Sequence, residues 1–347
     1  MTEPSTLDTE TPRVSPPPAP PRFGRTARVA TMVVATIVLA GLAIGYVGFK
    51  KSSKPAEAPA TAETVSLAPG PRLLTLTSTG QVTTVDKANP GGARAVSTTK
   101  CDRVHAAAGT GACLFADGVI GTVWLRVLDA DLRERKAIEI SGVPNRVRVS
   151  ASGRMVAWTA FVGGDSYATL NFATRTGIYD TKTGTVFKTL ETFAVTRDGK
   201  PYQSVDVNYW GVTFTADDNT FYATMYTDGR RYLVKGDFAA RTVETLRDQF
   251  ECPSLSPDGT RIAFKSAIDG DYTLGWRLSV LDLATNQVTT TAETRSVDDQ
   301  AAWLDNSTLS YVQQLDDGGK EVWTVPADGS GKPTLLLRDA HSPTALG

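Results

Sequence analysis

The chain has 347 residues, with 36 Lys and Arg against 37 Asp and Glu and a formal net charge of −1. This balance supplies no global positive field, so we expect neither nucleic acid nor an anionic lipid surface as a charge-driven partner. Two histidines and three cysteines leave little material for a metal site, and we expect no metal and no other cofactor.

The first long element in the chain is a predicted membrane anchor. Residues 29–49 are an uncharged run of 21 residues between Arg28 and Lys50. At about 1.5 Å per residue a helix of this length reaches roughly 30 Å, enough to cross the hydrocarbon core of a bilayer. A cleavable signal peptide is the alternative, but its apolar core is usually about 7 to 15 residues and a small-x-small site follows it closely. We therefore expect one uncleaved transmembrane helix over 29–49.

The segments on either side of this helix cannot build a core. Residues 1–28 contain a proline-rich run over 15–21, which is typical of a disordered or polyproline II tail. Residues 50–62 are rich in Lys, Ser, Pro and Ala and indicate a tether. Four arginines before the span and three lysines after it favour, by a narrow margin, a cytoplasmic position for the 1–28 tail.

A degenerate repeat follows the tether. Its clearest copy runs from Ser256 to Phe264 and closes with Leu281-Asp282-Leu283. Two more copies follow the same pattern; they are 150–158, closed by 179–181, and 215–223, closed by 236–238. A repeat of about 40 to 50 residues, made of short strands and Gly/Asp turns, is the signature of a β-propeller.

Residues 63–347 divide into six such cassettes of four strand-like runs each. The alternation in Arg277-Leu278-Ser279-Val280-Leu281 is what a half-buried strand needs. The expected strands of the first two cassettes are Thr64–Leu67, Arg72–Leu76, Gln81–Val85 and Ala93–Val96, then Arg103–Ala106, Ala112–Phe115, Val123–Leu128 and Ala137–Ile140; the others span 145–193, 207–246, 252–292 and 300–337. The prediction is an all-β, six-bladed propeller preceded by a single transmembrane helix. Both end cassettes look complete, so we expect no shared-strand closure.

The motif from Ser256 to Phe264, with Leu281-Asp282-Leu283 after it, resembles the WD-like repeat of TolB-type six-bladed propellers over about residues 63–340. That resemblance implies a fold shared by scaffolds, sensors and peptidase-associated domains. The layout is also similar to actinobacterial membrane-anchored TolB-like proteins of unassigned function. TolB proper is soluble and carries an α/β domain where this chain has its anchor and tether, so a Tol–Pal role does not transfer. The resemblance and the bulk of the domain favour a single-pass cell-membrane protein with an extracytoplasmic propeller.

The cassette alignment predicts a ring of polar residues at one mouth of the central channel, because the innermost strand of each blade lines that channel. The predicted binding residues are Asp102, Arg103, Asn145, Arg146, Asn208, Tyr209, Glu251, Asp298, Asp299 and Gln300, with Glu63 beside them. Such a set suits a peptide, a polar small molecule or a protein loop. The alternative is that they are solvated loop ends. The adjacent Asp298 and Asp299 fall short of the roughly six to eight oxygens that calcium takes.

Three further features bear on function. Cys101 and Cys113 are a disulfide candidate if the domain is exported, although the inferred register sets them diagonally and argues for strain. Cys252 is expected to be a buried, unreactive thiol. The inserted loop over 163–172 is a candidate recognition loop, with packing against its blade as the alternative.

No catalytic residue is predicted. Gly164 to Ala168 only half matches a nucleophile elbow, and neither His105 nor His341 has a neighbouring acid and nucleophile. The preferred function is non-catalytic binding of a protein, peptide or envelope component by the membrane-anchored propeller. The alternatives are a hydrolase or lyase acting through mouth carboxylates, and a structural platform in a membrane complex.

Overall fold

The computed structural model describes Leu39 and residues 64–117, 122–162 and 173–347. Contacts divide the chain into two units, residues 1–56 and 57–347. The tail over 1–28, the tether over 50–62 and the span over 29–49, Leu39 excepted, lie outside the described residues. In the part that is described, no helix is long and apolar enough to cross a membrane.

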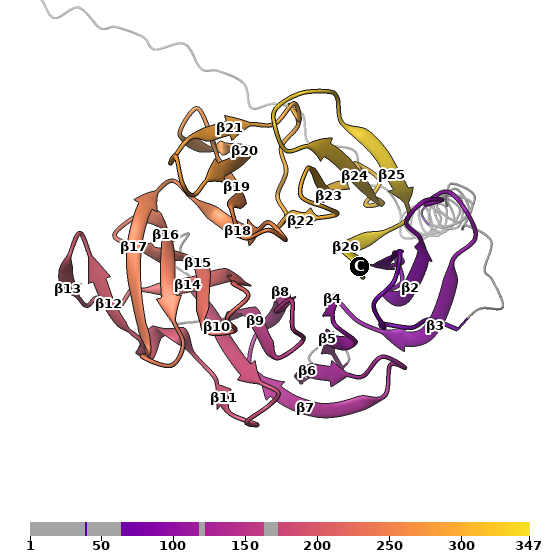
Figure 1. The fold of residues 1–347 in the computed structure, drawn as a ribbon, viewed down its shortest axis with the longest axis horizontal. Helices are drawn as coiled ribbons and strands as arrows, with labels where there is room; N and C mark the ends of the chain where they lie inside the picture. The colour runs from indigo at the N-terminus through magenta and orange to yellow at the C-terminus, as the bar shows by residue number, and fades with distance from the viewer. Residues whose placement is uncertain (1–38, 40–63, 118–121, 163–172) are drawn as a thin grey trace, which may run out of the picture. The chain divides into compact units, whose positions relative to one another are not determined.

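The second unit is a ring of six antiparallel sheets, the blades, arranged around a common central axis (Figure 1). From the inner strand outward, blade 1 consists of β26 (His341–Ala345), β1 (Arg72–Leu76), β2 (Gln81–Asp86) and β3 (Ala95–Lys100), and blade 2 of β4 (Arg103–Ala107), β5 (Thr110–Ala116), β6 (Val123–Leu128) and β7 (Glu134–Ile140). Blade 3 consists of β8 (Val143–Val149), β9 (Met155–Val162), β10 (Ala173–Asp180) and β11 (Val186–Phe187), and blade 4 begins with β14 (Asn208–Phe214), β15 (Thr220–Thr227), β16 (Arg230–Asp237) and β17 (Thr242–Asp248). Blade 5 consists of β18 (Glu251–Leu255), β19 (Arg261–Ile268), β20 (Asp271–Asp282) and β21 (Val288–Thr290), and blade 6 of β22 (Ala302–Trp303), β23 (Thr308–Gln314), β24 (Lys320–Pro326) and β25 (Thr334–Arg338). The predicted all-β six-bladed propeller is confirmed.

The repeat is the turn that joins an inner strand to the next strand of its blade. In blade 5 the N–H of Gly259 donates to the carbonyl of Ser256 at 2.9 Å, and Asp258 accepts from the N–H of Thr260 at 3.0 Å. Gly259 has φ of 70°, a backbone conformation that favours glycine. The closing motif then returns to this turn, where the N–H of Leu283 donates to the carbonyl of Thr260 at 3.0 Å.

Two other blades repeat the closing hydrogen bond. In blade 3 the N–H of Thr181 donates to the carbonyl of Arg154 at 2.9 Å, and in blade 4 the N–H of Phe238 donates to that of Asn219 at 3.0 Å. The repeat is therefore a local hydrogen-bond pattern. This explains why it can be recognised in several blades although the residues around it differ from blade to blade.

Six buried apolar clusters hold the ring together, one at each junction between neighbouring blades. For example, Met155 and Ile178 of blade 3 pack with Phe221 of blade 4, and Tyr222 of blade 4 packs with Phe264 of blade 5. The remaining junctions have equivalent clusters, including one between blade 6 and blade 1. A single blade cannot bury both of its faces, so stacking in a closed circle is what stabilises each sheet.

The prediction that the ring lacks a shared strand is wrong. The C-terminal strand β26 pairs with β1 and supplies the inner strand of blade 1, with Leu73 opposite Ala345. The predicted inner strand Thr64–Leu67 forms no β-ladder. Leu67 is nevertheless fully buried, and its N–H donates to the carbonyl of Ala130 at 2.8 Å. The alternation of apolar residues over 64–67 therefore reflects their burial, although the backbone of this segment is irregular and forms no strand.

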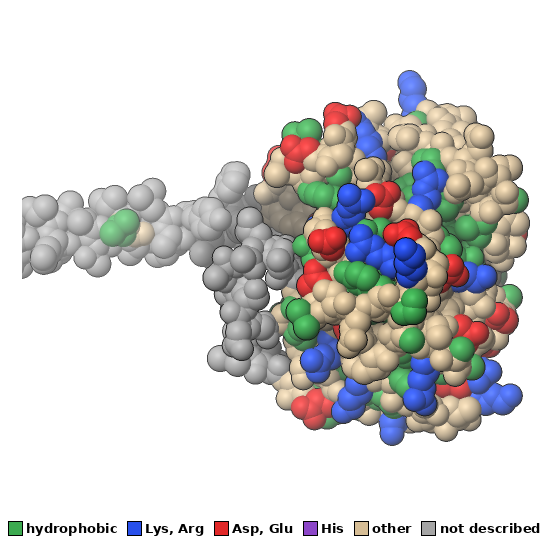
Figure 2. All heavy atoms as spheres, turned by 90° about the vertical axis from the view of Figure 1, so that its left-hand side faces the viewer, with side chains coloured by type: hydrophobic (Ala, Val, Ile, Leu, Met, Phe, Trp, Pro, Cys, Tyr) green, Lys and Arg blue, Asp and Glu red, His purple; other side chains and the backbone are tan. Residues whose placement is uncertain are grey.

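Blade 4 carries two strands that the sequence prediction did not include. A hairpin of β12 (Ala194–Arg197) and β13 (Lys200–Tyr202) follows the short 3-10 helix η1 (Leu190–Thr192), and β12 pairs in parallel with β17. The blade therefore has six strands, and it extends outward from the ring on the left of Figure 1. Figure 2 shows this side of the propeller, where basic and acidic side chains are intermixed and do not form a patch of one sign.

Candidate functional site

The candidate site lies at the end of the ring where the six inner strands begin, which we call the mouth face. Five of the inner strands follow the last strand of the preceding blade, whereas β14 follows the outermost hairpin of its own blade. The inner strands contact one another around the channel. Residues at the start of the inner strands therefore converge on one opening, although they are far apart in the sequence.

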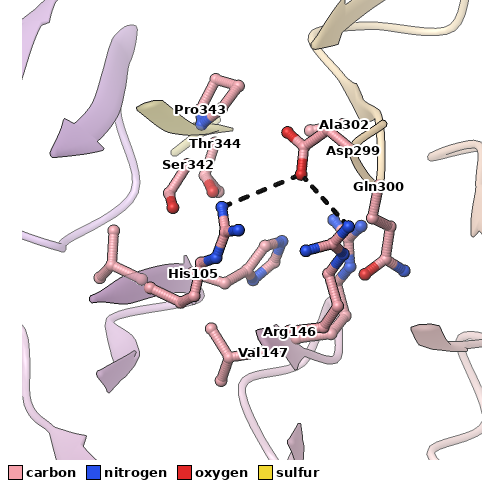
Figure 3. A pocket seen from close by; sticks show the side chains of 12 residues that line it. His105, Arg146, Val147, Asp299, Gln300, Ala302, Ser342, Pro343 and Thr344 are labelled. Atoms are coloured by element: carbon pink, nitrogen blue, oxygen red, sulfur yellow. Dashed lines mark ion pairs between the residues drawn. The ribbon is translucent and has the colours of Figure 1, made fainter. Parts of the chain in front are cut away.

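Two arginines share one carboxylate inside this opening. Asp299 Oδ1 lies 4.0 Å from a guanidinium nitrogen of Arg103 on β4 and 4.0 Å from one of Arg146 on β8 (Figure 3). All three side chains are largely buried. At 4.0 Å the contacts are ion pairs rather than hydrogen bonds, since charge-assisted bonds are about 2.7–2.9 Å long. The structure thus brings predicted residues of blades 2, 3 and 6 together.

The same cavity is lined by residues that the sequence analysis did not select. Arg148 follows Arg146 along β8, His105 lies on β4, and Thr344 lies on β26 (Figure 3). The N–H of Val149 donates to Nδ1 of His105 at 3.1 Å. Burial, reinforced by the charge of Arg148, holds the pKa of His105 well below its usual value, so this imidazole is neutral near pH 7.

A second polar cluster joins blades 4, 5 and 6 beside the cavity. Lys265 Nζ lies 3.3 Å from Glu251 Oε2 and also contacts Asp298, while Arg231 Nε contacts the other Glu251 oxygen. Lys265 and Glu251 are buried, whereas the Asp298 side chain is 73 % exposed. Burial raises the pKa of the Glu251 carboxyl, an effect that the charges of Lys265 and Arg231 oppose.

Aromatic rings lie against the two cations of this cluster, Arg231 and Lys265. The Arg231 guanidinium lies 3.8 Å from the ring centroid of Tyr272, and Lys265 Nζ lies 4.3 Å from that of Trp276. On blade 4, Trp210 stacks on Tyr226, and the Arg231 guanidinium lies 5.5 Å from the centroid of the Tyr226 ring. A cation over an aromatic face is attracted by the ring, and this cation–π attraction is stronger in a partly dry site. This part of the mouth therefore presents aromatic and charged groups together.

The remaining predicted residues have mainly structural contacts. Asp102 is exposed and accepts from the N–H of Ala116 at 2.8 Å. Asn208 accepts from the N–H of Thr174 at 2.8 Å, and Asn145 accepts from Arg146 through its carbonyl at 3.1 Å. Gln300 does line the cavity with Arg146 and Asp299 (Figure 3), and its side chain donates to the carbonyl of Pro253 at 2.7 Å.

Tyr209 does not line the mouth, because its ring is fully buried in the apolar cluster between blades 3 and 4. Glu63 lies outside the described residues, as does the candidate recognition loop over 163–172.

Most large apolar side chains that are exposed in the described propeller lie at the mouth face. Val143 begins β8 and pairs with Phe161 at the end of β9. Val205 precedes β14, Leu274 lies near the start of β20, and Leu315 follows the end of β23. Val288 at the start of β21 lies at the opposite end of its blade. Blades 3 to 6 thus each place at least one exposed apolar side chain at the mouth face.

The cysteines are arranged as one bonded pair and one thiol. Cys101 and Cys113 form a disulfide, with their Cα atoms 5.4 Å apart, inside the usual range of roughly 4.4–6.8 Å. The expected diagonal offset is present, but it does not prevent the bond. Cys252 is buried and unbonded, and burial raises the pKa of its thiol. Among the residues described, no three His, Cys, Asp or Glu side chains are grouped to hold a metal ion.

Comparison with known proteins supports the fold alone. No protein-family model matches the chain, and no curated protein matches it. TolB from Acinetobacter baumannii matches with a TM-score of 0.55 at 16 % identity over 81 % of this chain and 68 % of that one. A putative TolB from Agrobacterium tumefaciens also matches, with a TM-score of 0.47 at 12 % identity over 77 % of this chain and 88 % of that one. A nidogen/laminin complex matches with a TM-score of 0.47 at 14 % identity over 80 % of this chain and 99 % of that one. The first of these matches confirms the TolB-like propeller fold that the repeat predicted.

Proposed function

We propose that this propeller binds a protein or peptide partner at its mouth face, and that residues 29–49 anchor it in a membrane with the propeller outside the cytoplasm. The observation that carries the first part is the group of exposed apolar side chains that blades 3 to 6 place at a charged, aromatic mouth. Isolated exposed apolar residues are ordinary, but a group of them at one end of a rigid scaffold suits protein recognition.

The composition of the mouth supports a polypeptide partner rather than a nucleic acid. Interfaces are enriched in Trp, Tyr and Arg, and Trp210, Tyr272, Trp276 and Arg231 lie together here. The chain as a whole, with a formal net charge of −1, supplies no positive field for a phosphate backbone.

The proposed location rests on two features of the chain. One is the uncharged run over 29–49, which is long enough to span a bilayer. The other is the Cys101–Cys113 disulfide, a bond that persists mainly in oxidising compartments outside the cytoplasm. Both favour an anchored, extracytoplasmic propeller.

An enzyme acting through mouth carboxylates is the alternative. A general base needs a carboxylate that is available to the substrate. In the described mouth Asp299 contacts two arginines, and Glu251 contacts Arg231 and Lys265. Asp298 is 73 % exposed, but it also contacts Lys265. These contacts favour binding over catalysis.

Site-specific photocrosslinking tests the proposal in the full-length chain, in cells that make it. A photoreactive phenylalanine is placed at Leu274 or Val205 on the mouth face, and at Val288 as a matched exposed control on the opposite end. We expect Leu274 and Val205 to crosslink the same partner and Val288 to crosslink none. The partner's affinity should then fall at least about tenfold for Leu274→Asp and stay unchanged for Val288→Asp. Equal crosslinking from all three positions, or none from the mouth, would overturn the proposal.

A further inference from the structure

The channel cavity holds more positive than negative charge. Arg103, Arg146 and Arg148 line it, and Asp299 is the one carboxylate among its lining residues. With His105 neutral, the lining carries a formal charge of +2. Asp299 stands 4.0 Å from both Arg103 and Arg146, so its single charge is divided between two loose contacts.

Burial makes this imbalance costly. The pKa of Arg148 is lowered to about 10 and that of Arg103 is lowered from its usual value, in both cases chiefly because burial penalises the charged form. Burial also acts on Arg146, but Cys252, Asp299 and Asp298 outweigh it and raise the pKa of that guanidinium. Arg148 donates to the carbonyl of Ala301 at 3.3 Å and forms no ion pair among the described residues. A buried cation without an anionic partner is destabilising until a negative charge arrives.

Several polar atoms of the cavity lack hydrogen-bond partners. They are Nε of Arg146, Nε of Arg148 and Oγ1 of Thr344, all buried and without a partner among the described residues. Thr344 is 4 % exposed, and Figure 3 shows it on the opposite side of the view from Arg146. His105 accepts through Nδ1, so its neutral ring carries the proton on Nε2 and is a further donor. These groups can donate four hydrogen bonds, a set suited to an oxyanion.

We propose that this cavity binds a carboxylate group between Arg146, Arg148 and Thr344. A carboxylate has two planar oxygens that match the guanidinium fork, and it neutralises the excess charge without the bulk of a tetrahedral anion. The cavity volume of about 40 Å³ admits roughly three water molecules, and therefore the head of one carboxylate. The group comes either from a free small carboxylic acid or from an acidic residue or chain end of a bound polypeptide.

The first measurement uses ¹³C-acetate and the full-length chain in detergent micelles, with binding read from broadening of the acetate NMR line. We expect saturable binding that equimolar chloride does not displace. Arg146→Gln should weaken it at least about tenfold, because a charge-assisted hydrogen bond and a unit of charge are lost. Asp299→Asn should tighten it several-fold, because the competing carboxylate is removed. Arg133→Gln, on an exposed outer loop, is the matched control and should change nothing.

The Asp299→Asn variant keeps the proposal falsifiable if Arg146→Gln fails to fold. Absence of saturable acetate binding in the wild type, displacement by equimolar chloride, or weaker binding in Asp299→Asn would each overturn it. A short peptide with a free C-terminus, its C-terminal amide and a glutamate-containing amide separate the sources of the carboxylate. The proposal goes beyond the proposed function, because acetate tests the cavity without any partner, whereas crosslinking at Leu274 tests the mouth face without reference to the cavity.

Discussion

Lys265 Nζ lies 3.3 Å from Glu251 Oε2, and this buried ion pair connects the first two strands of blade 5. Arg231 of blade 4 contacts the second oxygen of Glu251, and Asp298 of the segment leading into blade 6 contacts Lys265. The four charges therefore link three blades at the mouth face. An arrangement of this kind fixes the relative position of the inner strands that carry the candidate site.

Lys265→Met is expected to destabilise the propeller by about 3–5 kcal/mol. The substitution preserves the length of the side chain but leaves the buried Glu251 with one cation instead of two. Urea unfolding measures the loss, and Lys235→Met, on the exposed face of β16, should stay within about 0.5 kcal/mol of the wild type. Adding Glu251→Gln to Lys265→Met should recover part of the loss; a double variant as unstable as the sum of both singles would contradict this account.

Glu191 should make stability fall as the pH rises through the neutral range. Both of its carboxylate oxygens are buried without a hydrogen-bond partner among the described residues, and burial raises its pKa from 4.5 to about 7. The folded state therefore holds a proton that the unfolded state has released, and the associated stability is lost between about pH 4.5 and 7.

In Glu191→Gln this loss is absent. We expect the free energy of unfolding of the variant, relative to that of the wild type, to rise by about 2 kcal/mol between pH 5 and pH 8. The raised pKa of Glu191, converted at ~1.4 kcal/mol per pKa unit, gives a larger value. We expect less because the Glu191 side chain is partly accessible to solvent. Urea titrations at both pH values give the difference, and the exposed Glu139→Gln serves as the control. Parallel pH profiles for Glu191→Gln and the wild type would show that the carboxyl is charged and solvated.

The disulfide gives a prediction that mass spectrometry can check. The chain has three cysteines, so alkylation of the denatured protein should add one group, at Cys252, before reduction and three after it. Replacing Cys101 and Cys113 by serine should cost about 3 kcal/mol, since the bond closes a loop with a sequence separation of 12. A reductant should lower the urea midpoint of the wild type but not that of the double variant. Three additions without reduction would rule out the bond.

Removing residues 341–347 should open the ring. This truncation deletes β26, leaves the inner edge of β1 unpaired and removes the buried Leu346. We expect a loss of more than about 4 kcal/mol in the free energy of unfolding, together with proteolytic cleavage within blade 1. Removing Gly347 alone, which is exposed, is the control. An unchanged urea midpoint after the longer truncation would mean that blade 1 is complete without β26.

The sequence predicts blades 2 to 6 well because each repeat encodes its own turn. The local hydrogen bonds around Ser256–Thr260 need no distant partner, so the pattern is visible in one chain. Blade 1 is different, because its inner strand joins residues 341–345 to residues 72–76 across the whole propeller. The short polar stretch His341-Ser342-Pro343-Thr344 does not read as a strand, and only the ring geometry selects it.

The hairpin β12–β13 was missed although its signal was present. Asp198-Gly199 joins the two strands with φ of 52° and 73°, the backbone that an Asp-Gly hairpin turn adopts. Its strands are too short for their alternation to be noticed, and the pairing of β12 with β17 supplies the rest of their stability.

The candidate site was predicted in part, because cassette alignment finds where inner strands begin but not which side chains are buried. It selected Arg103, Arg146 and Asp299, which do converge. The alternation of Arg146 and Arg148 along β8 places both on one face of the strand and could have added Arg148. Thr344 could not be found without the correct inner strand of blade 1, and Lys265 enters the mouth from a second strand that the alignment did not consider.

The position of β26 also determines when the ring of blades can close during synthesis of the chain. Residues 341–345 leave the ribosome after every other strand of the propeller, yet they belong to the sheet whose remaining strands are made first. The nascent chain therefore carries an unprotected edge at β1 throughout the synthesis of the other five blades, and exposed edges are sites of wrong pairing. The interval between synthesis of the first blade and of its last strand is therefore when the β1 edge is most exposed to wrong pairing.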